Sequence, residues 1–336
     1  MRIVYLANPV EDFLQDLLYH GLASRLGSEN VIEFPPLERY HRPAPDDARH
    51  PQLWFSFPEP PRVPLREAAL SADAVVVGSL RSGIRGLVDE VLDLEGRPPI
   101  VYVDGEDDSD VLGVVSRVDV YFKRELLLTG ALNRAREIRR RRRDQRERPD
   151  VDDPLRAPIG IAWAGDSRLR PLPLGWVGPL PEPGRKEFDV AFLFHPTSPE
   201  RTVVRSQLER LSADGIRVRL LAEGERLDWW SYMNVLARSR IALAVRGLGY
   251  DTFRYWEVPA AGALLLAETP RTLIPGNFAH GREAVFAPLH RLVARIPELL
   301  DGDSERIAHA GQERLLAAHT SVNRAQAVLD DLASVC

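Results

Sequence analysis

Arg254 and Glu257 are the residues of this sequence whose types and spacing most readily support chemistry. They follow a glycine-containing loop at 246–252 (RGLGYDT), which comes directly after the apolar, strand-like run IALAV. Glycines let a phosphate approach the backbone, and the helix that starts after the loop offers it unpaired N–H groups. Arg254 would add charge-assisted hydrogen bonds to a diphosphate, and Glu257, on the same helical face, would accept hydrogen bonds from sugar hydroxyls. The alternative is an ordinary strand-to-helix turn with a surface Arg–Glu pair, because a short Gly-x-Gly loop is a weak signal.

The predicted donor-binding set is completed by residues of two loops, the first of which is the glycine-containing loop at 246–252. The second loop follows the strand-like run DVAFLF, and both loops are expected at the carboxyl ends of strands in one sheet. Arg201 and Arg205 are alternatives for a second phosphate contact, and one of the two is expected on the surface of its helix. Asp251 and Thr252 are also candidate helix caps. The other members of the set are His195, Thr197, Arg246, Gly247, Gly249 and Tyr250.

An acidic loop, VDGEDDSD (103–110), follows a strand-like run in the first half of the chain. Asp104, Glu106 and Asp107 are the candidate catalytic residues, because this loop is expected to face the cleft in which an acceptor hydroxyl loses its proton. The alternative is a solvated acidic turn. Its oxygens would also suit Mg²⁺, but the loop lacks the spacing of an EF-hand, and we predict no metal site.

The elements that position the donor loop alternate between strand and helix from about residue 187. The order is the strand DVAFLF, a helix at 200–215, a strand at 216–222, a helix at 228–239, and then IALAV, the loop and its helix. This alternation predicts a doubly wound parallel sheet, whose ligands bind beyond the carboxyl ends of the strands.

The first half of the chain predicts a second α/β domain. Strands are expected at 2–7, 31–36, 73–79, 99–105 and 119–124, and leucines at helical spacing predict a helix over 14–26. Residues 35–64 are expected to form a long loop. Residues 149–186 contain eight prolines and read as an interdomain segment, in which 159–165 could still add a short strand.

Composition excludes several classes of protein. The net charge of −5 gives no overall bias toward nucleic acid or anionic membranes, and the single cysteine rules out an internal disulfide. No apolar run approaches the length of a membrane span, and the first residues do not resemble a secretory signal, so we predict a cytoplasmic protein without a transmembrane segment.

A basic run from Arg139 to Arg143 interrupts the apolar pattern of the first half. A continuous run places charge all around a helix, which is typical of a solvated helix before a linker. The alternative interpretation is a binding site for an anionic partner.

Four segments of the second half resemble those of group-1-type glycosyltransferases. The donor-site signature is Arg254-x-x-Glu257 followed by AAGALLLAE; the others are HGREAVFAP (280–288), the C-terminal helices around AGQERLLAAHT, and RSQLERL (205–211). The resemblance covers about 187–335, and its closest subgroup is the CgeB-like spore-maturation proteins. One position departs from the pattern, because retaining relatives usually carry an acid eight residues before the helix glutamate, where this sequence has Gly249.

The resemblance implies an α/β fold of the GT-B type, with two Rossmann-like domains facing each other across a cleft. Residues 1–186 would form the acceptor-side domain, 187–320 the nucleotide-sugar domain, and 321–336 a helix that crosses back. The implied activity is transfer of a sugar from a nucleotide-diphosphate donor, bound as a substrate and without a separate cofactor, to an unknown acceptor. The acceptor could be a glycan, a lipid-linked molecule, a protein or a small molecule.

Two other functions fit the same fold. One is a non-catalytic binding or assembly protein that keeps the GT-B-like architecture, since a fold does not fix a function. The other is an enzyme of the sugar-nucleotide epimerase type, which needs no acceptor. Dinucleotide chemistry is disfavoured because the first strand leads into ANPVED, without a glycine fingerprint.

Overall fold

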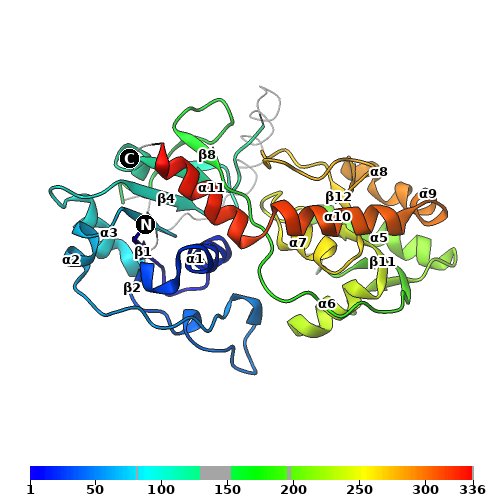
Figure 1. Ribbon diagram of the computed structural model, residues 1–336. Helices are drawn as coiled ribbons and strands as arrows, with labels where there is room; N and C mark the ends of the chain where they lie inside the picture. The colour runs from blue at the N-terminus through cyan, green and yellow to red at the C-terminus, as the bar shows by residue number, and fades with distance from the viewer. Residues whose placement is uncertain (81, 129–152, 195–197, 335–336) are drawn as a thin grey trace.

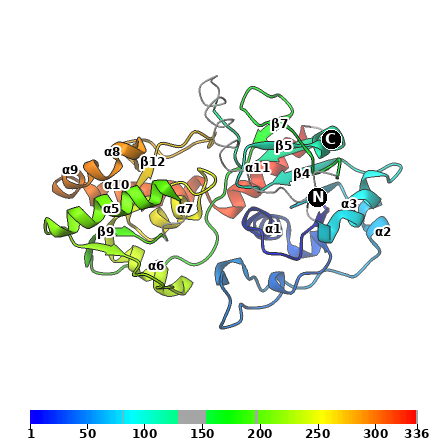
Figure 2. The ribbon, with the colours of Figure 1, turned by 180° about the vertical axis from the view of Figure 1, so that it is seen from behind.

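The chain folds around two parallel sheets, one in each half of the sequence. The computed structural model describes residues 1–80, 82–128, 153–194 and 198–334. Figure 1 shows the N-terminal sheet and its helices in blue to green, and the C-terminal sheet and its helices in green to orange. Figure 2 shows the same two halves from behind, with α5 and α6 in the C-terminal half.

The N-terminal sheet has six described strands, all parallel, in the order β2-β1-β3-β4-β6-β8. A short antiparallel pair, β5 and β7, lies outside it. The strands are β1 (Ile3–Leu6), β2 (Val31–Phe34), β3 (Ala74–Val77), β4 (Ile100–Asp104), β5 (Asp110–Leu112), β6 (Val120–Lys123), β7 (Pro158–Ile161) and β8 (Leu169–Pro171). The helices are α1 (Phe13–Leu26), α2 (Leu65–Leu70) and α3 (Arg85–Leu92).

The C-terminal sheet has five described strands, also parallel, in the order β10-β9-β11-β12-β13. Its strands are β9 (Phe188–Phe192), β10 (Val218–Leu220), β11 (Ser239–Ala244), β12 (Leu264–Glu268) and β13 (Val285–Ala287). The helices of this half are α5 (Pro199–Ala213), α6 (Trp229–Ala237), α7 (Phe253–Ala260), α8 (Leu289–Leu292), α9 (Ile296–Asp301) and α10 (Ser304–Ala318).

Each sheet is covered on both faces because its central strands contain runs of consecutive apolar residues. In β1, Ile3 and Tyr5 join the core that contains the leucines of α1, whereas Val4 and Leu6 join the core under α2 and α3. Successive residues of a strand point to opposite faces, so a continuous apolar run requires packing on both sides. The predicted α/β fold class with two Rossmann-like domains is confirmed.

The last helix, α11 (Ser321–Ala333), leaves the C-terminal half and packs on α1 of the N-terminal half. Figure 1 shows α10 and α11 in red, running from one half to the other. A Cβ at Gly21 of α1 would lie 2.1 Å from the carbonyl oxygen of Ser321, so glycine is what lets the two helices approach. The proline-rich segment joins this crossing, because Trp176 exchanges backbone hydrogen bonds of 2.7 and 2.8 Å with His319 and Ser321.

The segment at 149–186 is more structured than its composition predicts. It supplies β7 and also β8, an edge strand that pairs with β6. Proline is tolerated at a sheet edge because no neighbouring strand needs its missing N–H, and Pro171 ends this edge strand. No helix in the described ranges is both long and apolar enough to cross a membrane.

Candidate functional site

The candidate donor site lies where the strand order of the C-terminal sheet reverses. The chain runs from β9 outward to β10 and then returns to β11 on the other side of β9, so the loops that leave β9 and β11 diverge. A crevice between such loops is where doubly wound sheets bind ligands. The loop after β9 leads to α5, and the loop at 246–252 leads from β11 to α7.

Two arginine side chains converge on one aromatic ring in this crevice. The guanidinium carbon of Arg201, on α5, lies 4.3 Å from the ring centre of Phe194, and that of Arg254, on α7, lies 4.0 Å from it. Arg254 also donates a 2.8 Å hydrogen bond to the Leu193 carbonyl. Burial, and then the charge of Arg254, lower the pKa of Arg201 to about 10. Two neighbouring cations with lowered hydration suit a ligand with several negative charges.

Glu257 lies one turn further along α7 and is 8% exposed. The Tyr232 hydroxyl donates a 2.8 Å hydrogen bond to its carboxylate, and the Arg254 guanidinium lies 5.4 Å from the same tyrosine ring. Burial raises the pKa of Glu257, while Arg254 and the Tyr232 hydroxyl act in the opposite direction. The structure therefore brings Arg254 and Glu257 together around Tyr232, a residue of α6.

Arg205 and Arg246 are engaged with protein groups rather than with the arginine pair. Arg205 forms a 3.0 Å contact with Glu209 and donates to the Leu221 carbonyl at 2.9 Å. Arg246 contacts Glu200 at 2.8 Å and Glu268 at 3.6 Å, and it also donates to the Tyr250 hydroxyl. Of the two arginines considered for the second phosphate contact, Arg201 is the one beside Arg254.

The glycines of the loop make room for side chains. A Cβ at Gly247 would lie 3.0 Å from a guanidinium nitrogen of Arg201. A Cβ at Gly249 would lie 2.2 Å from a carboxylate oxygen of Glu125, which comes from the N-terminal half. Protein groups fill the space beside both glycines in this structure, and their role in the approach of a phosphate stays a prediction.

Asp251 has a structural role instead of the predicted donor contact. Its carboxylate is fully buried, and it accepts hydrogen bonds from the Trp256 indole at 2.7 Å and from the backbone N–H of Leu174 at 2.6 Å. Thr252 is the N-cap residue of α7 by position, but its side chain makes no capping hydrogen bond. A buried carboxylate with these partners ties the proline-rich segment to α7, so we no longer count Asp251 as a ligand of the donor.

The acidic loop divides into a buried and an exposed part. Asp104 is fully buried, forms a 2.8 Å ion pair with Lys123 and accepts the Tyr121 hydroxyl, so it cannot reach an acceptor hydroxyl. Asp107 is half exposed and pairs with Arg124 at 2.8 Å. Glu106 is exposed in the same loop. We correct the prediction for Asp104, and Glu106 and Asp107 keep positions from which they could meet an acceptor.

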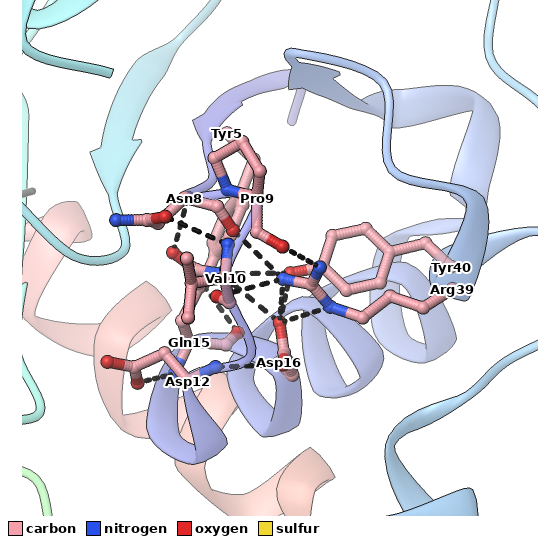
Figure 3. Close-up of polar contacts among 9 residues, drawn as sticks. All are labelled: Tyr5, Asn8, Pro9, Val10, Asp12, Gln15, Asp16, Arg39 and Tyr40. Atoms are coloured by element: carbon pink, nitrogen blue, oxygen red, sulfur yellow. Dashed lines mark hydrogen bonds and ion pairs between the residues drawn. The ribbon is translucent and has the colours of Figure 1, made fainter. Parts of the chain in front are cut away.

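The loop between β1 and α1 is held by a network of polar contacts (Figure 3). Arg39 donates to the carbonyls of Asn8 and Pro9 at 2.9 and 2.7 Å and forms a 2.9 Å ion pair with the buried Asp16. The Tyr40 hydroxyl donates to Asp16 at 2.6 Å. Burial raises the pKa of Asp16 to about 6, although Arg39 opposes the rise.

Two hollows open on the N-terminal half. One, of about 490 Å³, opens beside β2 and is lined by Phe34, Leu37 and Arg62, among others. The other, of about 360 Å³, separates the aromatic side chains of Trp54 and Phe57 from the proline-rich segment. Both volumes fall in the range of small-molecule sites.

Some predicted residues lie outside the described part of the chain. His195, Thr197 and the basic run from Arg139 to Arg143 belong to this group. Within the described ranges, no cluster of three or more His, Cys, Asp or Glu side chains could hold a metal ion.

Comparison with known proteins bears on both the sheet and the arginine pair. Residues 201–330 match a family described as glycosyl transferase-like. This glycosyl transferase-like region contains Arg201, Arg254 and Glu257, and it ends within α11. No curated protein matches the sequence.

Solved structures are similar over nearly the whole chain. HepE from Anabaena in complex with UDP and glucose has a TM-score of 0.54 and 13% identity, covering 99% of this chain and 100% of that chain. HepE in complex with UDP-glucose has a TM-score of 0.51 and 12% identity, with the same coverage. Sucrose-phosphate synthase from Thermosynechococcus elongatus has a TM-score of 0.47 and 13% identity, covering 100% of this chain and 99% of that one. The HepE similarity shows a common fold for both halves, including the glycosyl transferase-like region.

Two residues that shape the site, Phe194 and Glu125, were not among the predicted site residues. Phe194 directly precedes the candidate His195, so its place at a strand end was the available signal. Glu125 gave no such signal, because Asp251, which donates a backbone hydrogen bond to it, is 126 residues away in the sequence.

Proposed function

We propose that the protein is a glycosyltransferase that moves a sugar from a nucleotide-diphosphate donor to an acceptor hydroxyl. The observation that carries this proposal is the pair Arg201 and Arg254 on the ring of Phe194, at the strand-order reversal of the C-terminal sheet. The glycosyl transferase-like match over 201–330 supports it.

In the proposed reaction the acceptor oxygen attacks the anomeric carbon as the bond from that carbon to the diphosphate oxygen breaks. The two guanidinium groups would stabilise the charge that grows on the leaving diphosphate. Glu257 would accept hydrogen bonds from the ribose hydroxyls. The acceptor proton would pass to Glu106 or Asp107, the exposed carboxylates of the facing loop. Because the arginine pair supplies the positive charge, we propose that transfer needs no divalent metal.

The base of the donor is best tested first with uridine nucleotides. The HepE structures of similar fold are complexes with UDP and with UDP-glucose, and this motivates UDP as the first ligand. The proposal includes the narrower likeness to the CgeB-like subgroup.

Nucleotide binding is the decisive experiment. UDP and UDP-glucose should raise the melting temperature, with GDP, dTDP and ADP as comparisons, because a ligand at 100 times its Kd adds about 2.7 kcal/mol of stability. The absence of any shift with millimolar nucleotides would contradict the proposal.

The products distinguish the remaining functions. A glycosyltransferase releases the nucleoside diphosphate in step with acceptor glycosylation. An epimerase would convert the nucleotide sugar without an acceptor, and a binding protein would show a melting shift without turnover. Chromatography of the nucleotide pool separates these three results.

A further inference from the structure

Gly249 lies where a side chain would not fit, although its backbone conformation does not require glycine. It is not among the glycines with positive φ, so alanine is conformationally allowed there. A Cβ would nevertheless lie 2.2 Å from a Glu125 carboxylate oxygen and 3.0 Å from the backbone carbonyl oxygen of Asp107. Both neighbours belong to the N-terminal half. The glycine therefore forms a notch that admits a carboxylate from the other domain.

Glu125 fills this notch and is held there from both sides. Its side chain is 1% exposed and accepts a 2.8 Å hydrogen bond from the backbone N–H of Asp251. The charged groups that face it are Arg124, on its own segment, and the buried carboxylate of Asp251, on the donor loop; the Tyr250 backbone N–H also contacts it. Asp251 is followed directly by Thr252, which is the N-cap residue of α7.

Other contacts join the two halves at the same place. Arg124 pairs with Asp107 at 2.8 Å and with Asp251 at 3.4 Å, so it bridges the acidic loop and the donor loop. Directly after Glu125, the backbone of Leu126 accepts from Leu273 at 2.7 Å, and Leu128 donates to Arg271 at 2.7 Å. Glu125 thus sits at one end of a cross-domain backbone pairing.

We propose that Glu125 is a positioning residue, inserted by the N-terminal domain into the Gly249 notch, which fixes the 246–252 loop and makes donor binding depend on contact between the domains. A fixed loop sets the start of α7, and with it the place of Arg254 against Phe194. The part of the inference that concerns the donor rests on the proposed function, whereas the interdomain contact does not. Reciprocity then requires a bound nucleotide to favour the closed contact.

The test compares Glu125→Ala, Glu125→Gln, Gly249→Ala and the double variant Glu125→Ala/Gly249→Ala. Gly86→Ala is the matched control, because a Cβ at Gly86 meets nothing within 4 Å. Hydrogen exchange of the 246–252 peptide reads the contact without any nucleotide. We expect faster exchange in Glu125→Ala and Gly249→Ala, little change in Glu125→Gln, which keeps an acceptor oxygen, and none in Gly86→Ala.

The double variant identifies the mechanism. If Gly249→Ala acts by expelling Glu125, it should add little to Glu125→Ala, because effects of directly coupled residues are not additive. Fully additive effects on exchange, or wild-type exchange in both single variants, would overturn the proposal.

Nucleotide affinity gives the second readout. Both single alanine variants should weaken UDP binding about tenfold, within the range usual for coupled sites, and Glu125→Gln should restore most of it. Unchanged affinity in the presence of altered exchange would overturn the link to the donor. If the wild-type protein binds no nucleotide at all, the proposed function fails, while the exchange data still decide whether Glu125 holds the loop.

Discussion

Two guanidinium groups on one phenyl ring form the most distinctive charge arrangement at residue scale. The ring of Phe194 offers both cations its negative face, and this attraction partly offsets the repulsion between them. In the proposed function, a bound diphosphate would offset more of this repulsion.

Arg254→Ala should weaken nucleotide binding by about 1.5–3 kcal/mol, the usual contribution of a hydrogen bond to a charged group. Arg254→Lys should restore only part of it, because an ammonium cannot reproduce a planar, two-pronged contact. Isothermal titration with UDP measures both. Arg205→Ala is the control, since Arg205 is paired with Glu209, and an equal loss in that variant would contradict the assignment.

Arg39→Ala should destabilise the fold by about 3–5 kcal/mol, because it leaves the buried Asp16 without its partner cation. The same change removes the donors that hold the carbonyls of the β1–α1 loop. Urea unfolding provides the measurement. Arg42→Ala removes an exposed ion pair with Glu38 and should change stability by less than about 1 kcal/mol. Similar losses in the two variants would show that burial of the Asp16 pair has no special effect.

At the scale of elements, features set by residues close together in the sequence could be predicted, whereas features set by contacts between distant segments could not. The apolar run of β11, the loop after it and the start of α7 are set by residues adjacent in the chain, and all three were predicted. The neighbours of the glycines were not, because Glu125 and Arg201 reach Gly249 and Gly247 through tertiary structure. Likewise β8 is stabilised by pairing with β6, which overrides a proline-rich composition.

The packing of α11 on α1 gives a test at this scale. Gly21→Ala would place a Cβ 2.1 Å from the Ser321 carbonyl oxygen, so the helices must separate. Overpacking of this kind typically costs about 1–3 kcal/mol. Gly86→Ala, in α3, has open space and should be neutral or stabilising by up to about 1 kcal/mol. The melting temperature should therefore fall in Gly21→Ala and stay level or rise in Gly86→Ala, and a melting temperature for Gly21→Ala at or above that of wild type contradicts the prediction.

At the scale of the whole molecule, the Glu125 contact makes stability depend on pH. Burial raises the pKa of Glu125 from 4.5 to about 7, with Asp251 adding to the rise and Arg124 opposing it. Between these two values the folded protein keeps a proton that the unfolded chain releases, so stability falls as pH rises from about 4.5 to 7. This increase in the pKa corresponds to a loss of about 3 kcal/mol in the free energy of unfolding.

Glu125→Gln should remove this loss. The difference in unfolding free energy between the variant and wild type should grow in favour of the variant from pH 5 to pH 7.5, and then level off. Urea titrations at several pH values measure it, and the comparison cancels other groups that titrate in the same range, such as Asp16. A difference that stays constant with pH would show that Glu125 is ionised throughout.

The crossing of α11 onto α1 also has a consequence for synthesis on the ribosome. The face of α1 that receives α11 emerges early, but the helix that covers it is made only after the entire C-terminal half. At about 5–20 residues per second, roughly 15 to 60 s separate the two events. During that interval the nascent N-terminal half exposes the face of α1 around Gly21, which in the finished protein is covered by Ser321 and Ala325 of α11. The order of translation therefore leaves this face of α1 uncovered until α11 has been made.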